Sequence, residues 1–297
     1  MSMAVSPATA LGVDIGGTTI KVGRVASDGS LTDTRTVPTP RDPHVLAEVI
    51  ATEVDRTPEP VIGVVNPGII DERTGVVTFA ANLGWRDLPL QAILERRLGR
   101  RVVLGHDVRA GALAESLWGA GAAGDMLFMP LGTGIASALV LDGVVRGTGW
   151  AGEVGQVLVA DPDHPGTRVP FEQIASASAL AARYAAATGS SDVSAGARGV
   201  LERLADGDPV AAEIVRTAID TLADLLADTA GLLGPVPIVL GGGLAEAGDA
   251  VLEPLRAALV QRLPGELRAP LRAAVLGSWA GCLGAGALAL ELRQERR

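Results

Sequence analysis

Glycine and threonine gather at a point where the chain could bind phosphate. The residues Asp14, Gly16, Gly17, Thr18 and Thr19 stand between two runs of apolar, β-forming residues. Backbone N–H groups in such a turn, together with threonine hydroxyls, form a concavity that binds anions. The Asp14 carboxylate could hold Mg²⁺ directly or through water. The alternative is an ordinary glycine hairpin in which Asp14 is only a turn residue.

Two further glycine turns repeat this chemistry later in the chain. One comprises Gly132, Thr133 and Gly134, and the other comprises Gly241, Gly242 and Gly243. Two Gly-Thr turns facing each other could clamp a triphosphate, and the triple-glycine turn would admit a nucleotide base or ribose. That last turn is equally consistent with a plain strand-to-helix connection. The sequence lacks G-x-x-x-x-G-K-[ST], which excludes a P-loop protein. No G-x-G-x-x-G opens a helix after a first strand with an acidic residue about 20 positions further on, so a dinucleotide-binding fold is disfavoured.

Hydrophobic periodicity predicts the elements that would position these turns. Alternation predicts a hairpin over 11–25, and spacings of three and four residues predict helices. The expected strands are 31–37, 61–65, 102–104, 126–129, 135–141, 236–240 and 273–276; the expected helices are 43–55, 88–98, 108–118, 171–188, 195–205, 209–233, 250–262 and 280–295. Because glycine-rich strand turns recur about 120 residues apart, we expect two similar α/β lobes with a cleft between them.

Composition narrows the function classes. The 297 residues include 34 acidic and 25 basic ones, for a formal charge of −9. Such a chain, without a Lys/Arg cluster, is a poor partner for nucleic acid or an anionic membrane. Its single cysteine, Cys282, excludes an internal disulfide and a cysteine-rich zinc site. No apolar run could span a bilayer and no signal-peptide pattern opens the chain, so we expect a soluble, cytoplasmic protein.

Several short blocks resemble, in their order, the sugar kinases of the ROK family (repressors, open reading frames, kinases) in the actin/hexokinase-like ATPase superfamily. The blocks are Asp14–Thr18, Pro67–Gly68, Asn82–Trp85, His106–Asp107, Leu131–Gly134, Gly152–Gln156, Glu172 and Gly241–Gly243. The resemblance implies an α/β, two-lobed fold with mixed sheets and an inter-lobe cleft. Residues 1–108, completed by a C-terminal helix at 281–297, would form the small lobe, and residues 109–280 the large one.

The resemblance also implies an activity. Family members transfer the γ-phosphoryl group of ATP to a sugar hydroxyl, most often O6 of a hexose, and glucose or a glucose-like hexose is the expected substrate. ATP and Mg²⁺ are the expected cofactors, and a homodimer is the expected assembly.

Individual residues receive roles from the same resemblance. Asp107 matches the family's catalytic aspartate and would accept the proton of the sugar hydroxyl; its alternative role is a helix N-cap. Asp14 and the two Gly-Thr turns would hold Mg·ATP. The positions that match sugar contacts, or lie beside them, are Pro67, Gly68, Asn82, His106, Glu153, Gln156 and Glu172. The alternatives are a solvated surface residue for Glu153 and stabilisation of a helix N-terminus for Glu172.

Three positions depart from the family pattern. Gln156 stands where many relatives have a histidine that binds a structural zinc and touches the sugar near its anomeric end, and the aligned segment Asp161–Glu172 has no cysteine. His106 replaces the usual asparagine beside the catalytic aspartate. Thr19 replaces a frequent lysine, with Lys21 two residues further on. We therefore expect no structural zinc and an altered sugar site, so a modified hexose (kanosamine, glucosamine, an N-acetylhexosamine) or a cyclitol is an alternative substrate.

Two other functions compete with a kinase. The family includes sugar-sensing repressors, but Asp14 lies too early in this sequence for a preceding helix-turn-helix, and the charge opposes DNA binding. A non-catalytic sugar sensor is the other alternative, although Asp107 and both phosphate turns are present. Polyphosphate as the phosphoryl donor would favour a strongly basic groove, which the sequence does not show.

Overall fold

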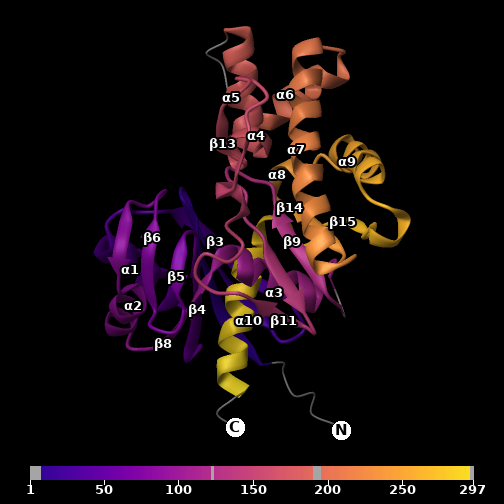
Figure 1. The fold of residues 1–297 in the computed structure, drawn as a ribbon. Helices are drawn as coiled ribbons and strands as arrows, with labels where there is room; N and C mark the ends of the chain where they lie inside the picture. The colour runs from indigo at the N-terminus through magenta and orange to yellow at the C-terminus, as the bar shows by residue number, and fades with distance from the viewer. Residues whose placement is uncertain (1–7, 122–123, 190–194, 295–297) are drawn as a thin grey trace. The chain divides into compact units, whose positions relative to one another are not determined.

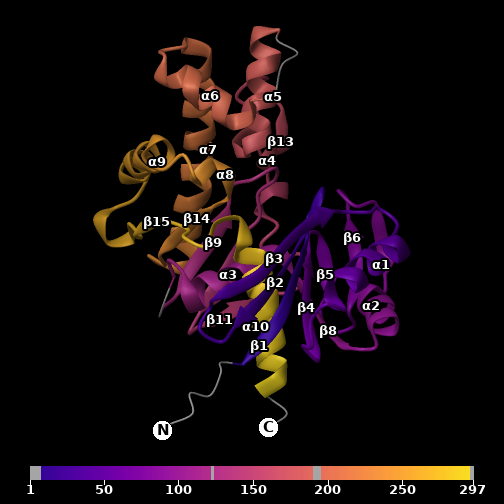
Figure 2. The ribbon, with the colours of Figure 1, turned by 180° about the vertical axis from the view of Figure 1, so that it is seen from behind.

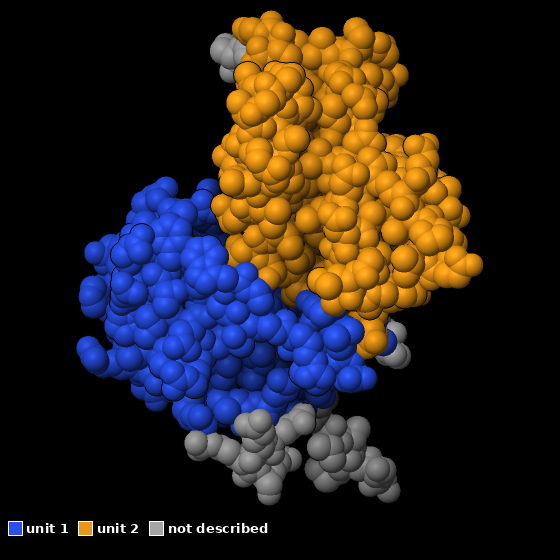
Figure 3. Space-filling view, in the orientation of Figure 1, with its two compact units in different colours: residues 1–124, 139–151, 278–297 blue, residues 125–138, 152–277 orange. Residues whose placement is uncertain are grey.

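The computed structural model describes residues 8–121, 124–189 and 195–294. The chain forms two compact units, which Figure 3 shows in different colours. The first unit comprises Met1–Gly124, Leu139–Ala151 and Ser278–Arg297, and the second comprises Asp125–Ala138 and Gly152–Gly277. Each unit combines β-sheet with α-helices, so the expected α/β class with mixed sheets is confirmed.

A five-stranded mixed sheet forms the centre of the first unit. Its strands, in spatial order, are β3 (Leu31–Pro38), β2 (Thr19–Ala26), β1 (Thr9–Ile15), β4 (Val61–Asn66) and β8 (Arg101–His106). β1 and β2 are antiparallel and form the expected hairpin, whereas β4 runs parallel to both β1 and β8. Every residue of β4 is buried, as expected for a central strand covered on both faces.

Helices cover both faces of this sheet. They are α1 (Pro43–Val54), α2 (Leu90–Leu98), α3 (Asp107–Trp118) and α10 (Ala280–Gln294). Leu46 and Ile50 of α1 and Leu94 of α2 join one apolar core with the strands, while α10 packs against β1, β4 and α3 (Figures 1 and 2). The expected helices begin and end within two residues of the observed ones, and residue 295 lies outside the described residues.

The C-terminal helix α10 approaches the sheet unusually closely. A Cβ atom on Gly63 of β4 would lie 1.7 Å from the carbonyl oxygen of Ala285, and one on Gly12 of β1 would lie 2.0 Å from that of Cys282. Glycine is therefore required at these two positions because helix backbone occupies the space of any side chain.

We expect Gly63→Ala to destabilise the protein by about 3 kcal/mol or more, because neither backbone can give way without repacking. Thermal unfolding would measure the loss. The control is Gly231→Ala, because that glycine is helical and its added Cβ meets no atom within 4 Å; this variant should gain up to about 1 kcal/mol from helix propensity. Equal unfolding temperatures for the two variants would contradict the close approach.

A smaller sheet of the first unit was not predicted from the sequence. It comprises β5 (Ile69–Asp71), β6 (Val76–Ala80) and β7 (Trp85–Leu88). The strands are three to five residues long and are separated by turns that each end in glycine, so no alternation is long enough to detect. The hairpin of β10 (Ala138–Leu141) and β11 (Val144–Arg146) turns at Asp142-Gly143 as expected, although its first strand begins at 138 rather than 135.

Three parallel strands form the centre of the second unit. They are β9 (Met126–Pro130), β14 (Ile238–Gly241) and β15 (Leu271–Ala273), with β14 in the middle. The surrounding elements are α4 (Glu172–Ala175), α5 (Ala177–Thr188), α6 (Gly196–Ala205), α7 (Pro209–Leu233), α8 (Gly242–Ala245), α9 (Asp249–Arg262) and the hairpin of β12 (Leu158–Ala160) with β13 (Arg168–Pro170).

Two expectations for this unit are wrong. The helix expected over 171–188 is broken at Ser176, whose hydroxyl accepts a hydrogen bond from the backbone of Ala179 and so caps α5. The last strand lies at Leu271–Ala273 rather than 273–276, because pairing with β14 fixes its register.

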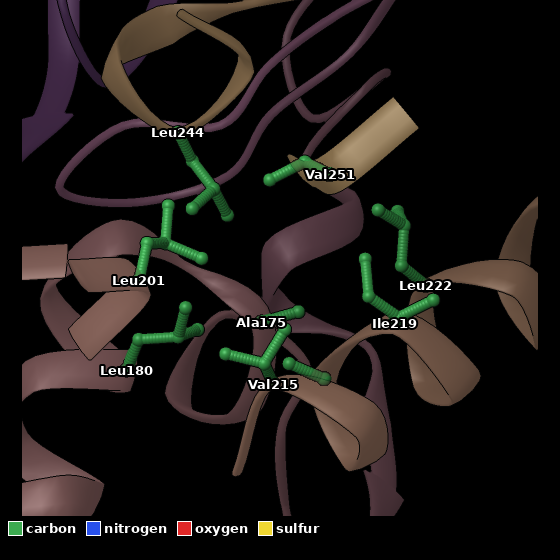
Figure 4. A pocket seen from close by; sticks show the side chains of 9 residues that line it. Ala175, Leu180, Leu201, Val215, Ile219, Leu222, Leu244 and Val251 are labelled. Atoms are coloured by element: carbon green, nitrogen blue, oxygen red, sulfur yellow. The ribbon is translucent and has the colours of Figure 1, made fainter. Parts of the chain in front are cut away.

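A small cavity lies in the core of the second unit (Figure 4). Nine apolar side chains line it: Ala175, Leu180, Leu201, Val215, Ala218, Ile219, Leu222, Leu244 and Val251. It offers no polar side chain for a sugar or a phosphate, so we interpret it as a packing defect. Within the described residues, no helix is both long and apolar enough to cross a bilayer.

Candidate active site

The first glycine turn, Gly16–Thr19, joins β1 to β2. The Gly16 N–H donates to the Thr19 carbonyl at 2.9 Å, and the Thr39 hydroxyl donates to the Gly16 carbonyl at 2.8 Å. These bonds hold the turn closed, while Gly17, Thr18 and Thr19 are exposed. The turn is therefore rigid at its base and open to a ligand at its tip.

The parallel strands bring further predicted residues to the same edge of the sheet. Asp14 is paired in register with Val65 near the end of β4, and Asn66 with His106 at the end of β8. Because the carboxyl ends of parallel strands meet at one edge, Pro67 and Gly68 lie beside the start of α3. Ligands of α/β proteins commonly bind at such an edge.

Asn82 also belongs to this group. A Cβ atom added to Gly17 would lie 3.9 Å from the Cβ of Asn82. The backbone carbonyl of Asn82 accepts a hydrogen bond from the Arg41 guanidinium at 3.0 Å. The Asn82 side chain therefore starts beside the first glycine turn, on a backbone that Arg41 anchors.

His106, and not Asp107, is the N-cap of α3. Its Nδ1 accepts from the backbone N–H groups of Val108 and Arg109 at 3.2 and 3.4 Å. Nδ1 then carries no proton, and the ring hydrogen of the neutral imidazole lies on Nε2. The N-cap alternative considered for Asp107 is therefore wrong; Asp107 is the first helical residue, and its side chain is 30% exposed whereas that of His106 is 4% exposed.

Asp14 is an unusual carboxyl group for its position. Asp14 keeps some contact with solvent, but protein atoms crowd its carboxyl group. A Cβ atom added to Gly281 of α10 would lie 2.7 Å from its Oδ2. Loss of hydration, and then the negative charge of Asp107, raise the pKa of Asp14 to about 7, against a smaller lowering by Lys21. Two carboxylates thus share one region with little cationic compensation, which favours a bound divalent cation.

Lys21 is the only lysine in the chain and the register partner of Asp14 across the hairpin. Its Nζ donates to the Ser278 carbonyl and lies 5.7 Å from the centroid of the Trp279 ring. The ammonium is held by the segment that precedes α10, within electrostatic range of Asp14. Its uniqueness in a chain rich in arginine is a signal that sequence reasoning alone could have used.

The second unit brings the remaining predicted residues together. The Leu131 N–H donates to the Gly241 carbonyl at 2.8 Å, and the Leu244 N–H donates to the Leu131 carbonyl at 3.1 Å. These two bonds place the turn of Gly132, Thr133 and Gly134 beside that of Gly241, Gly242 and Gly243. The two turns therefore form one glycine-lined surface.

Glu172 lies against the same turn. Its Oε2 accepts from the Ile135 N–H at 3.2 Å, and its Oε1 accepts from Nε2 of Gln156 at 2.7 Å. Glu153 precedes the 3-10 turn Val154–Gln156 and is partly exposed. The predicted residues thus fall into two groups, one within each unit.

The ROK family profile matches residues 10–292 of the chain. The chain belongs to the ROK family. Its relatives include the glucokinase of Streptomyces coelicolor, 33% identical over 95% of this chain and 97% of that protein. The N-acetylmannosamine kinase of Citrobacter koseri is 34% identical over 94% of this chain and 98% of that protein. The crystal structure of a ROK family glucokinase from Streptomyces griseus, in complex with glucose and AMPPNP, has a TM-score of 0.80 at 32% identity and covers 96% of this chain and 100% of its own.

In this ROK protein, ion pairs hold the segment that begins at Asp161. His164 Nδ1 lies 2.9 Å from Oδ2 of Asp161, and the buried Arg183 donates to both carboxylate oxygens of Asp163 at 2.6 and 2.8 Å. Arg183 also donates to the carbonyl of Ile174 in α4. Among the described residues, no group of three or more His, Cys, Asp or Glu side chains is placed to hold a metal ion.

Proposed function

We propose that this ROK protein is an ATP-dependent hexose kinase that phosphorylates O6 of glucose or a glucose-like hexose. The observation that carries the proposal lies within the first unit. There the partly exposed carboxylate of Asp107 begins α3 at the sheet edge that also carries Asp14 and the exposed Gly-Thr turn. A base beside a phosphate site is what phosphoryl transfer to a hydroxyl requires.

The chain's own residues would divide the work as follows. Asp107 accepts the proton of the sugar hydroxyl while the hydroxyl oxygen bonds to the γ-phosphorus. The bond between the γ-phosphorus and the oxygen of the β-phosphate breaks, which releases ADP. The turn of Gly16, Gly17, Thr18 and Thr19 donates N–H and hydroxyl groups to phosphate oxygens. Asp14 fits a Mg²⁺ ligand because its carboxylate is poorly hydrated and faces a second carboxylate; the ion would neutralise phosphate charge.

The glycine-lined surface of the second unit is proposed to receive the rest of the nucleotide. Gly132, Thr133 and Gly134 would contact phosphate, and Gly241, Gly242 and Gly243 the ribose or base. A backbone without side chains permits the close approach that both contacts need.

Sugar-binding roles are proposed for residues of each unit. In the first unit these are Asn82, His106 and the backbone of Pro67 and Gly68. In the second unit they are Glu153, Gln156 and Glu172. Gln156 uses one amide hydrogen on Glu172 and keeps its carbonyl oxygen as an acceptor. A sugar amine is therefore a plausible partner, and a modified hexose remains the alternative substrate.

ADP release measured across a panel of acceptors would test the proposal. The panel comprises glucose, mannose, fructose, glucosamine, kanosamine, the N-acetylhexosamines and cyclitols with Mg·ATP. Transfer from polyphosphate to glucose yields no ADP and would be followed by the formation of sugar phosphate. Turnover with glucose supports the proposal, and faster turnover with an amino sugar selects the alternative. Binding of sugar without turnover from either donor would replace the kinase with a sugar sensor.

We also propose that no structural zinc is present, because ion pairs already hold the segment 161–170. Purified protein should then contain far less than one zinc per chain by elemental analysis, and EDTA should leave its unfolding temperature unchanged. Arg183→Met should instead lower stability by about 2 kcal/mol, since the buried carbonyls of Ile174 and Ile214 lose a hydrogen-bond donor. Stoichiometric zinc, with unfolding on chelation, would contradict this proposal.

The protein is further proposed to act as a cytoplasmic homodimer without nucleic-acid or membrane partners. The formal charge of −9 supports the last two points. Sedimentation equilibrium would decide the assembly state.

A further inference from the structure

A single carboxylate oxygen links the junction between β8 and α3, where Asp107 lies, to the small sheet of the first unit. Oε1 of Glu72 accepts from the backbone N–H of His106 at 3.3 Å and from Nε of Arg109 at 3.2 Å. Glu72 lies in the turn between β5 and β6, more than 30 residues away in sequence. Its oxygen therefore bridges the residues on either side of the Asp107–Val108 pair.

The turn that carries Glu72 is itself ordered. Oδ1 of Asp71 accepts from the backbone N–H groups of Arg73 and Thr74 at 3.1 and 3.3 Å. These bonds close the turn around Glu72 and fix its backbone. The carboxylate of Glu72 thus reaches α3 from a fixed support.

Arg109 is the second member of the link. Its side chain is only 5% exposed, although a guanidinium is always charged. Beyond Glu72, its NH1 reaches the carbonyl oxygens of Gly149 and Ala151 at 3.5 and 3.4 Å. Glu72 is the only carboxylate that pairs with it among the described residues. A buried cation with one carboxylate partner depends strongly on that partner.

We propose that Glu72 and Arg109 are positioning residues for Asp107, and that they hold the β8–α3 junction at the orientation that proton transfer needs. This inference rests on the proposed function. His106 caps α3 through Nδ1, and its backbone N–H gives the junction a further anchor at Glu72. Loss of Glu72 would release that N–H and leave Arg109 buried without its counter-ion. Asp107, between the two, would lose its fixed direction.

The alternative is an ion pair that only adds stability. The two differ in what they predict for kinetics. A stabilising pair, when broken, lowers the unfolding temperature but leaves kcat of the folded fraction unchanged. A positioning pair lowers kcat, because misplacement of a reacting group by about 1 Å can cost 100-fold.

The experiment compares Glu72→Gln, Glu72→Ala, Arg109→Met and the double variant Glu72→Gln/Arg109→Met. Steady-state kinetics would give kcat and the KM values for ATP and sugar, and hydrogen exchange would follow the peptide that contains His106. We expect kcat to fall about 10-fold in Glu72→Gln and about 100-fold in Glu72→Ala, with KM for ATP within about threefold. The double variant should be no worse than the poorer single variant, because both act through one link.

Two control variants distinguish an effect on the position of Asp107 from an effect on folding stability. Arg73→Ala alters the same turn at a side chain that is 86% exposed, and should change nothing. Glu53→Gln breaks another ion pair of the first unit, Glu53 of α1 with Arg35 of β3 at 2.8 Å, in which the carboxylate is 11% exposed and the guanidinium side chain 22%. It should lower the unfolding temperature but not kcat.

The outcomes are distinguishable from those of the proposed function. If the wild-type protein phosphorylates no acceptor, the proposed function fails, whereas faster exchange of the His106 amide in Glu72→Ala would still show the link. If the wild-type protein is active and the Glu72 variants keep full kcat, or behave like Glu53→Gln, the positioning role is overturned.

Discussion

Asp107→Asn should lose about three orders of magnitude in kcat, within the range that a general base contributes. Asparagine has nearly the same shape but cannot accept the proton of the sugar hydroxyl. The fold should survive, because Oδ1 of Asp107 accepts from the Val108 N–H at 2.8 Å and an amide oxygen can do the same. His106 continues to cap α3. Binding of Mg·ATP, measured by calorimetry, should stay within about threefold because no nucleotide contact is removed.

A matched control exists for this substitution. Asp249 is the first residue of α9, as Asp107 is of α3, and it is exposed. Asp249→Asn alters the helix N-terminus in the same way, so it should leave kcat unchanged. Near-normal turnover of Asp107→Asn would refute the role of this carboxylate and would favour the sugar-sensor alternative.

Local chemistry made part of this site visible in the sequence. The turn at residues 14–19 is recognisable because glycines and threonines between two apolar runs are rare outside hairpins and phosphate sites. Likewise, the junction at His106–Asp107 follows a buried strand and precedes a helical periodicity. In both cases the signal lies within about ten consecutive residues, which is the range over which periodicity can be read.

What the sequence did not reveal depends on contacts between distant residues. Glu72 meets Arg109 across 37 positions, and nothing in the turn Asp71–Gly75 marks it as more than a surface connection. The sequence offers Asp107 as the N-cap of α3 because aspartate is a common cap and histidine is not. The extended backbone of His106 and the hydrogen bonds to its ring show that His106 is the cap. The protonation of Asp14 depends on burial by α10 and on Asp107, both of them remote in sequence.

Asp14→Asn should make the protein more stable at pH 8 and remove its kinase activity. Burial and the charge of Asp107 raise the pKa of Asp14 to about 7 from the model-peptide value of 3.8. Between these values the folded protein holds a proton that the unfolded chain releases, so stability falls as the pH rises and the loss is complete above pH 7. At pH 8 the ionised carboxyl costs on the order of 2–4 kcal/mol, which asparagine would recover.

The pH dependence separates this effect from an unrelated gain. Thermal unfolding of both proteins from pH 4 to 8 should show the advantage of Asp14→Asn vanishing near pH 4, growing up to about pH 7 and levelling off above it. Asp28→Asn is the control, because hydrogen bonds from Ser30 lower the pKa of that exposed carboxyl, and its removal should give no gain at pH 8. A variant less stable than wild type at pH 8 would show that Asp14 is effectively paired with Lys21.

Addition of Mg²⁺ tests whether Asp14 is kept as a metal ligand. A divalent cation on the ionised Asp14 relieves the cost, so Mg²⁺ should raise the unfolding temperature of the wild type at pH 8. The same addition should leave Asp14→Asn unchanged, because its neutral amide is a much weaker ligand for Mg²⁺. Stability that is lost in the metal-free protein and regained on binding is expected where a charged group is kept for function. An equal response of both proteins to Mg²⁺ would place the cation elsewhere and leave Asp14 with an electrostatic cost that its proposed role does not explain.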